Sequence, residues 1–373
     1  MNLDISAALH GTRLAQDSGM VNVMLGSRRA CGRRIAVSVL LALQALVAAS
    51  SDDPFSFLQP SVTVTPDDRS RLDRGTPVAR TLPAQGDEVA VFAAVPVNIG
   101  ADRLVAWMRR IEELKKSRYV LAIGRFSDPP RIEDLAALEL DDDDLSAIRN
   151  CSPGRCGLKL SSAEMTQLTA AATQAGTNWK PALQQEFRRV VLARVTGYLA
   201  GHPVGPYDDS RDPISPDREA VKPIEHSAFL SAHFPGLVRD LARASNRPPS
   251  GVEAFLYWSK ERLARRPVIS VTDVRILRSN DPSLPEVLVT GKELFSTHYV
   301  NASLGLTALA RGSPGGPNYL VYVNRSEVDV LHGVLAPIIR WAMQRRLRTE
   351  AAGVLQGIRR RLESGEPPVQ GVL

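Results

Sequence analysis

The sequence is poor in aromatic side chains, which make up 5% of its 373 residues. Proteins that bind single-stranded nucleic acid without sequence preference stack the bases on aromatic side chains. The low content of aromatic residues therefore argues against an extended surface that stacks nucleic-acid bases. Neither sign of charge predominates, because the chain beyond residue 50 holds 41 basic and 38 acidic residues, an excess of three. So small an excess predicts no nucleic-acid partner.

The sequence motifs of common nucleotide-binding and hydrolytic enzymes are absent. There is no Gly-x-Ser-x-Gly elbow, no Walker loop, no dinucleotide-binding glycine pattern and no zinc-protease helix. Two of the histidines, His226 and His233, are spaced to share a helix face. Zinc needs at least a third protein ligand, and Pro223 and Pro235 crowd the pair. We expect no metal and no cofactor.

The N-terminal region has the pattern of a secretory signal. Arg28, Arg29, Arg33 and Arg34 precede an uncharged apolar run, Ile35 to Ala49, which small residues close. The run is shorter than the roughly 20 residues that span a bilayer. We expect residues 1–50 to be excess N-terminal sequence and a signal peptide cleaved near Ser50, which places the protein in the periplasm or outside the cell. Retention as an N-terminal anchor is the alternative.

Two cysteines lie beyond this leader, Cys151 and Cys156, with the turn residues Pro153 and Gly154 between them. In an oxidising compartment such a pair is typically a disulfide. Four residues separate the cysteines, whereas the redox motif has two, and no histidine is near enough to complete a metal site. The sequence therefore predicts a structural disulfide.

The part of the chain that follows the predicted signal peptide begins with two regions of different composition. Residues 51–74 are polar and indicate a linker or a loosely attached arm. Residues 75–130 contain a buried strand, Val89 to Val97, then a helix from Ala101 to Lys116 and a further strand within 118–128.

Residues 131–250 form a mainly helical segment. We expect Asp143 or Asp144 to cap a short helix, Leu145 to Arg149, and Glu164 to cap back on Ser161 at the start of the next helix. The remaining predictions are a helix from Trp179 to Leu199, an irregular proline-rich loop over 201–223, and a helix from Phe229 to Ala244.

Residues 251–373 have the period of strands and then of a helix. Apolar and β-branched residues alternate in four segments with short turns between them, which favours an antiparallel sheet: Val268 to Leu277, Val287 to Phe295, Tyr299 to Leu309 and Tyr319 to Asn324. A long amphipathic helix, Leu331 to Glu363, ends the chain.

This order of elements resembles the START-like (helix-grip) fold, an α+β fold in which a curved antiparallel sheet wraps a long C-terminal helix. The matching parts are residues 86–116 and 255–363, and residues 131–250 would be a large helical insertion. The resemblance implies a cavity for an apolar ligand between sheet and helix. The segments at 151–156, 255–258, 292–299 and 322–326 also resemble those of uncharacterised exported bacterial proteins, a likeness that implies no function.

The candidate ligand contacts are polar and aromatic side chains on the predicted strands or near them: Tyr257, Trp258, Lys292, His298, Tyr299 and Arg325. His298 is also a weak candidate for an acid–base group. Five of them have a structural alternative, which for His298 is a hydrogen-bonded role in the sheet. Tyr257 and Trp258 would cap the core, Lys292 would be exposed or paired, and Arg325 would form a salt bridge with Asp329.

We expect a periplasmic binding protein for an apolar or lipid-like ligand. One alternative is an envelope interaction or scaffold protein without ligand, and another is a hydrolase or cyclase that uses His298. The terminal helix predicts a second partner, because its arginines could lie on an anionic membrane surface; a solvated helix face is the alternative. Those arginines are Arg340, Arg345, Arg346, Arg348, Arg359, Arg360 and Arg361.

Overall fold

A computed structural model describes residues 53–242, 248–262, 266–331 and 336–365 of the chain. The predicted signal peptide at 1–50 lies outside these residues. Within them, no helix combines the length and the apolar character needed to cross a membrane.

The strands of the described chain form one antiparallel sheet in the order β1-β2-β8-β7-β6-β5-β4-β3. This confirms the α+β class and the antiparallel pairing. β4 to β8 follow one another as hairpins, and β2 pairs with the last of them. The bounds are β1 Val78–Thr81, β2 Glu88–Val97, β3 Val120–Arg125, β4 Val252–Arg262, β5 Pro267–Arg278, β6 Val287–Ser296, β7 Val300–Ala310 and β8 Asn318–Val328.

Both faces of the sheet are covered, which explains why β2 is apolar at almost every position. Val89, Val91 and Ala93 belong to a core cluster with residues of the C-terminal helix α10 (Ala336–Ser364). Ala90 and Phe92, between them in sequence, belong to a second cluster with residues of α7, α8 and α9. We call these two sides of the sheet the α10 face and the α7 face.

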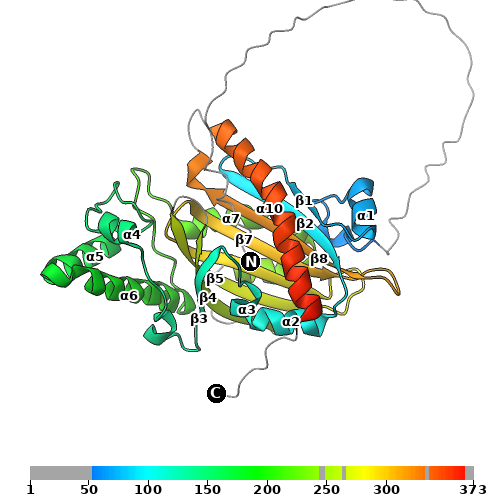
Figure 1. The fold of residues 1–373 in the computed structure, drawn as a ribbon, viewed down its shortest axis with the longest axis horizontal. Helices are drawn as coiled ribbons and strands as arrows, with labels where there is room; N and C mark the ends of the chain where they lie inside the picture. Colours follow the sequence, from blue (N-terminus) through cyan, green and yellow to red (C-terminus); the bar gives the residue numbers. More distant parts are fainter. Residues whose placement is uncertain (1–52, 243–247, 263–265, 332–335, 366–373) are drawn as a thin grey trace, which may run out of the picture. The chain divides into compact units, whose positions relative to one another are not determined.

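The C-terminal helix α10 crosses the α10 face over β1 and β2 (Figure 1). The predicted helix began at Leu331, whereas a 3-10 turn, Asp329–Leu331, stands there. On the same face the helix expected over 101–116 is divided at Arg110 into α2 (Ala101–Arg109) and α3 (Ile111–Leu114).

Three short helices cover the α7 face: α7 (Pro216–Glu225), α8 (Ala228–His233) and α9 (Pro235–Leu241). The prediction of a loop over 201–223 was wrong from Pro216 onward, because a proline at the first helical position favours helix rather than loop. The single helix predicted over 229–244 was also wrong, since Phe234 and Pro235 divide it.

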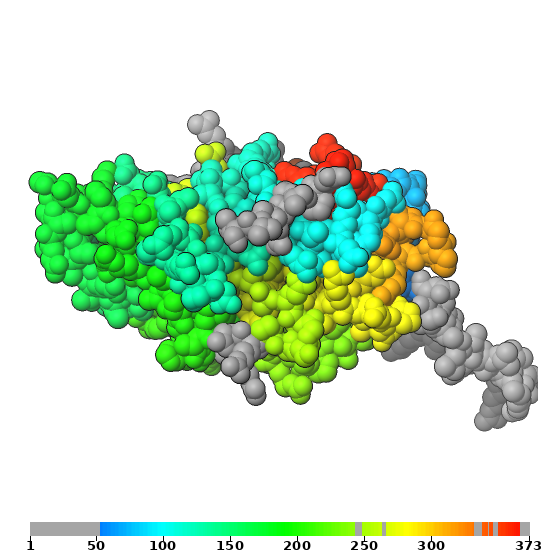
Figure 2. All heavy atoms as spheres, turned by 90° about the horizontal axis from the view of Figure 1, so that it is seen from below, coloured from blue at the N-terminus to red at the C-terminus, as the bar shows by residue number. Residues whose placement is uncertain are grey.

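The first part of the predicted helical segment contains α4 (Asp142–Ile148), α5 (Ser162–Gln174) and α6 (Trp179–Leu199). Its core cluster includes strand residues such as Trp258 and Phe295. In Figure 2 its spheres, in green, gather beside those of the strands. The capping box of Ser161 and Glu164 and the bounds of α6 are as predicted. The cap of α4 is Asp141, not Asp143 or Asp144, and it accepts a hydrogen bond from the Asp144 amide.

The arm at 51–74 differs from the predicted loose linker. It contains a 3-10 turn, Ser56–Leu58, and α1 (Pro66–Asp73). Phe55, Phe57 and Leu58 are buried in the core cluster of the α7 face. Its apolar residues, scattered among polar ones, are what fix it to the sheet.

Candidate functional site

A cavity of about 880 Å³ lies beside the C-terminal end of α6, on the α7 face near the end of β3. Helix α6 contributes Thr196, Leu199 and Ala200. The remaining lining residues come from the loop after β3 and from strands β4 and β5: Arg125, Phe126, Ser127, Asp128, Pro129, Pro130, Asp134, Ala254, Phe255, Leu256, Asp273 and Arg275. The volume is typical of small-molecule sites.

Apolar and polar side chains share the wall, and one carboxylate holds the loop that carries several of them. Asp134 accepts hydrogen bonds from the main-chain amides of Ser127 and Arg131 and from the Ser127 hydroxyl, at 2.8–3.0 Å. These bonds fix the turn that presents Pro129 and Pro130 to the cavity. The wall is therefore built before any ligand arrives.

A buried ion pair forms one part of the polar lining, which also includes Arg125, Ser127, Asp128, Asp134 and Thr196. Asp273 and Arg275, which point to the same side of β5, lie 2.8 Å apart between Oδ2 and Nη2. The Tyr198 hydroxyl donates to Asp273 at 2.6 Å, and Asp240 Oδ2 lies 3.5 Å from Arg275 Nη1. Burial raises the pKa of both carboxyls, and Asp273 raises the pKa of the Arg275 guanidinium against the opposing effect of burial.

Lys292, a predicted ligand contact, lies behind this pair. It is the cross-strand partner of Asp273, and its ammonium donates to the Leu241 carbonyl at 3.0 Å. Asp217 of α7 is 4.0 Å away. Burial lowers the pKa of Lys292. The inward and paired alternative therefore describes Lys292, which supports the cavity floor without lining the cavity.

Tyr257 and Trp258 point to opposite faces of β4, and neither lines the cavity. The Tyr257 hydroxyl accepts a hydrogen bond from Lys115 at 3.3 Å on the α10 face. The Trp258 indole donates to the Asp134 carbonyl at 2.8 Å on the other. Trp258 thus contacts a residue of the cavity wall, whereas Tyr257 belongs to the core.

His298 and Tyr299 follow β6, away from the cavity lining. His298 is 7% exposed, and its Nε2 lies 3.1 Å from Asp144 Oδ1, which also pairs with Arg266. Tyr299 has a φ of 62°, a backbone conformation uncommon for a residue with a side chain. His298 therefore contacts a carboxylate, but it does not line the cavity beside α6.

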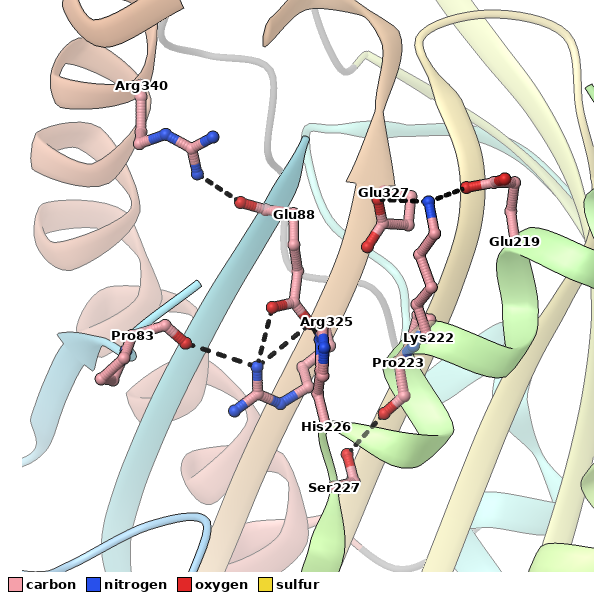
Figure 3. Close-up of polar contacts among 10 residues, drawn as sticks. All are labelled: Pro83, Glu88, Glu219, Lys222, Pro223, His226, Ser227, Arg325, Glu327 and Arg340. Atoms are coloured by element: carbon pink, nitrogen blue, oxygen red, sulfur yellow. Dashed lines mark hydrogen bonds and ion pairs between the residues drawn. The ribbon is translucent and has the colours of Figure 1, made fainter. Parts of the chain in front are cut away.

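Arg325 is buried on the α7 face and belongs to an ion network (Figure 3). Its Nη1 donates to both carboxylate oxygens of Glu88 at 3.0 Å. The predicted partner was Asp329, but Asp329 pairs with Lys159 at 2.8 Å. The partner prediction failed because Glu88 is 237 residues away in sequence.

The disulfide prediction is confirmed. Cys151 and Cys156 are bonded, with their Cα atoms 4.4 Å apart. The turn they close is attached to the neighbouring loop, since the amides of Gly154 and Cys156 donate to the carbonyls of Asp208 and Asp209.

Asp273 and Arg275 are the site residues that the sequence analysis missed. A signal existed: within β5, the run from Val268 to Leu277 contains two charged side chains, two positions apart, among apolar and β-branched residues. Alternation places both on one buried face, where charges occur in pairs. Their partners Tyr198 and Asp240 are distant in sequence and gave no such signal.

The described part of the chain contains no group of three or more His, Cys, Asp or Glu side chains that could hold a metal ion. Comparison of the chain with protein-family models, with curated proteins and with solved structures gave no match.

Proposed function

We propose that this is an exported binding protein that holds a small molecule with an apolar or lipid-like body in the cavity beside α6. The observation that carries the proposal is a preformed cavity of about 880 Å³ whose lining combines apolar side chains with a buried ion pair. Burial of a ligand's apolar surface there would contribute about 25 cal/mol per Å².

The Asp273–Arg275 pair would orient the ligand. Each partner neutralises the other, so a ligand meets a strong dipole rather than a net charge. Polar groups placed among apolar ones are the usual means of fixing a ligand's orientation in a pocket. We therefore expect a ligand with an apolar body and one hydrogen-bonding end.

A START-like relationship remains part of the proposal. It is supported by the antiparallel sheet and by the long C-terminal helix on one face. The cavity proposed here is on the opposite face from α10, however, and not between sheet and helix as the resemblance implied. Export is supported by the disulfide, which is typical of oxidising compartments.

A membrane surface remains a proposed partner, but fewer residues would contact it than the seven arginines of the C-terminal helix. Arg340 and Arg361 of α10 donate to main-chain carbonyls, of Glu88 and Leu114. Ile338 and Trp341, one turn apart, are more than half exposed, and the Arg345 guanidinium lies 5.5 Å from the Trp341 ring centre. Tryptophan and arginine together favour a membrane interface.

The test is native mass spectrometry of residues 51–373 purified from a periplasm, with organic extraction of whatever co-purifies. We expect an added mass that is lost on denaturation. Thr196→Trp, which fills the cavity from α6, should abolish it. Ala193→Trp, one turn earlier on α6 and outside the cavity, should leave it unchanged.

A clean protein mass, with no uptake from a lipid mixture, would contradict the proposal. That result would favour the alternative function, an envelope interaction or scaffold protein without ligand. Equal uptake by the two tryptophan variants would place the ligand elsewhere in the molecule.

A further inference from the structure

Two buried glutamates face each other at one end of the sheet. Glu88 of β2 and Glu327 of β8 are cross-strand partners with their side chains on the α7 face. They are 1% and 3% exposed. Like charges directly opposite each other on a sheet are destabilising, and burial adds to that cost.

Helix α7 places two basic side chains over these carboxylates, one helical turn apart. Lys222 Nζ lies 3.7 Å from Glu327 Oε2, and His226 Nδ1, just after the helix, lies 3.1 Å from Glu88 Oε1. In Figure 3 both reach from α7 toward the two strands. Lys222 and His226 are four residues apart, so both side chains can reach the same pair of strands.

Other charged groups complete the surroundings. From β8, Arg325 binds both oxygens of Glu88, and from α7, Glu219 lies 2.5 Å from Lys222. From α10, Arg340 donates to the main-chain carbonyl of Glu88. Asp87, before β2, adds a further negative charge near Glu327.

Proton uptake at this cluster has one direction of effect. Burial, together with the nearby Glu88, Glu219 and Asp87, raises the pKa of Glu327 to about 6 against the opposing effect of Lys222. A neutral Glu327 no longer repels Glu88. Protonation also removes the attraction of Glu327 to Lys222, but the net shift of its pKa is upward. Proton uptake by Glu327 therefore favours the arrangement in which α7 covers it on the sheet.

We propose that Lys222, His226, Glu88 and Glu327 form a proton-responsive clasp that holds α7 on the sheet more firmly in mild acid than at neutral pH. The clasp has a bearing on the cavity, since α7 also carries Asp217, which faces Lys292 behind the Asp273–Arg275 pair. That consequence rests on the proposed function, whereas the clasp itself does not.

Hydrogen exchange of the unliganded protein at pH 5.0 and pH 7.5 tests the clasp. Protection factors of the α7 amides remove the intrinsic pH dependence of exchange. We expect them to be about tenfold higher at pH 5.0, the ratio that corresponds to one unit of pKa difference. Glu327→Gln should raise them at pH 7.5 and reduce the ratio to about threefold or less.

Two further variants complete the design. His226→Gln should lower protection, because it removes the contact of the imidazole with Glu88. Glu253 of β4 forms an exposed ion pair with Arg109 of α2, and Glu253→Gln should keep the wild-type ratio. Equal protection of wild-type α7 at the two pH values would overturn the clasp, as would a Glu327→Gln protein that fails to fold. Neither result depends on whether a ligand binds.

Discussion

Lys115, just after α3, and Glu261 of β4 form a buried ion pair with 2.5 Å between Nζ and Oε1. Their side chains are 4% and 8% exposed. The Ser259 hydroxyl donates to the same carboxylate oxygen at 2.6 Å, and Lys115 also donates to Tyr257. Lys115 and Ser259 lower the pKa of Glu261 against the effect of burial. This network attaches the end of α3 to the sheet.

Lys115→Met should destabilise the protein by about 3 kcal/mol, because the charge of Glu261 would be left buried without its partner. Chemical denaturation at pH 7 measures the loss. The adjacent Lys116 supplies the control: its pair with Glu113 is exposed, so Lys116→Met should change the free energy of unfolding by about 0.5 kcal/mol or less. Similar losses in the two variants would mean that the Lys115 pair is open to water.

Glu327 gives a pH dependence of the opposite sign to that of an ordinary salt-bridged carboxylate. Its pKa is about 6 in the folded protein, against an ordinary value of 4.5 for a glutamate. The stability linked to its proton is present below about pH 4.5 and is lost as the pH rises through about 6. Glu327→Gln should therefore stabilise by about 1–2 kcal/mol at pH 7.5 and by far less at pH 4.5.

Denaturation midpoints of wild type and variant at the two pH values check this prediction. A Glu327→Gln variant that is less stable at pH 7.5 would show that Lys222 pairs with Glu327 strongly enough to outweigh burial. Lys222→Met should move stability in the other direction at pH 7.5, since it leaves Glu327 without its cation.

The sequence was most informative where the local pattern determines the structure. Helix α6, the Ser161–Glu164 cap and the Cys151–Cys156 bridge depend on neighbouring residues and agree with prediction. β4 was not predicted as a strand, because Lys260 and Glu261 interrupt its apolar run. Glu261 is tolerated there only because Lys115, distant in sequence, neutralises it.

The site was less predictable for the same reason. Its polar residues come from separate elements, and Tyr198 meets Asp273 across 75 residues of sequence. Lys292 was chosen as a charge on an otherwise apolar strand, and Arg325 as a charge that follows the last predicted strand. Each is paired or hydrogen-bonded by groups that only the folded chain brings near.

Removal of the disulfide should cost about 2 kcal/mol, the loop-closure entropy of so short a ring. Cys151→Ser with Cys156→Ser should lower the midpoint of thermal unfolding, and a reducing agent should lower that of the wild type equally. A larger effect of reducing agent on wild type than of the double substitution would mean that free thiols themselves disturb the turn. Since Gly154 and Cys156 bond to Asp208 and Asp209, local protection of that loop should fall as well.

Gly124 of β3 lies beneath the Trp258 indole, and this contact gives the last prediction. A Cβ at position 124 would lie 2.7 Å from Trp258 Nε1. The indole is fully buried and is fixed by its hydrogen bond to Asp134, so it cannot move aside cheaply. Gly124→Ala should therefore destabilise by about 1–3 kcal/mol. Gly197→Ala, in open space within α6, should instead stabilise by up to about 1 kcal/mol.

The same substitution also tests the cavity wall, because Asp134 holds both the indole and the loop at 127–131. A displaced indole would move Asp134 and loosen that loop, so Gly124→Ala should shift tryptophan emission and weaken ligand uptake together. A variant with reduced stability but unchanged emission would place the strain in the backbone of β3 instead. An unchanged midpoint would mean that the indole is free to shift, and that the wall is less rigid than its hydrogen bonds imply.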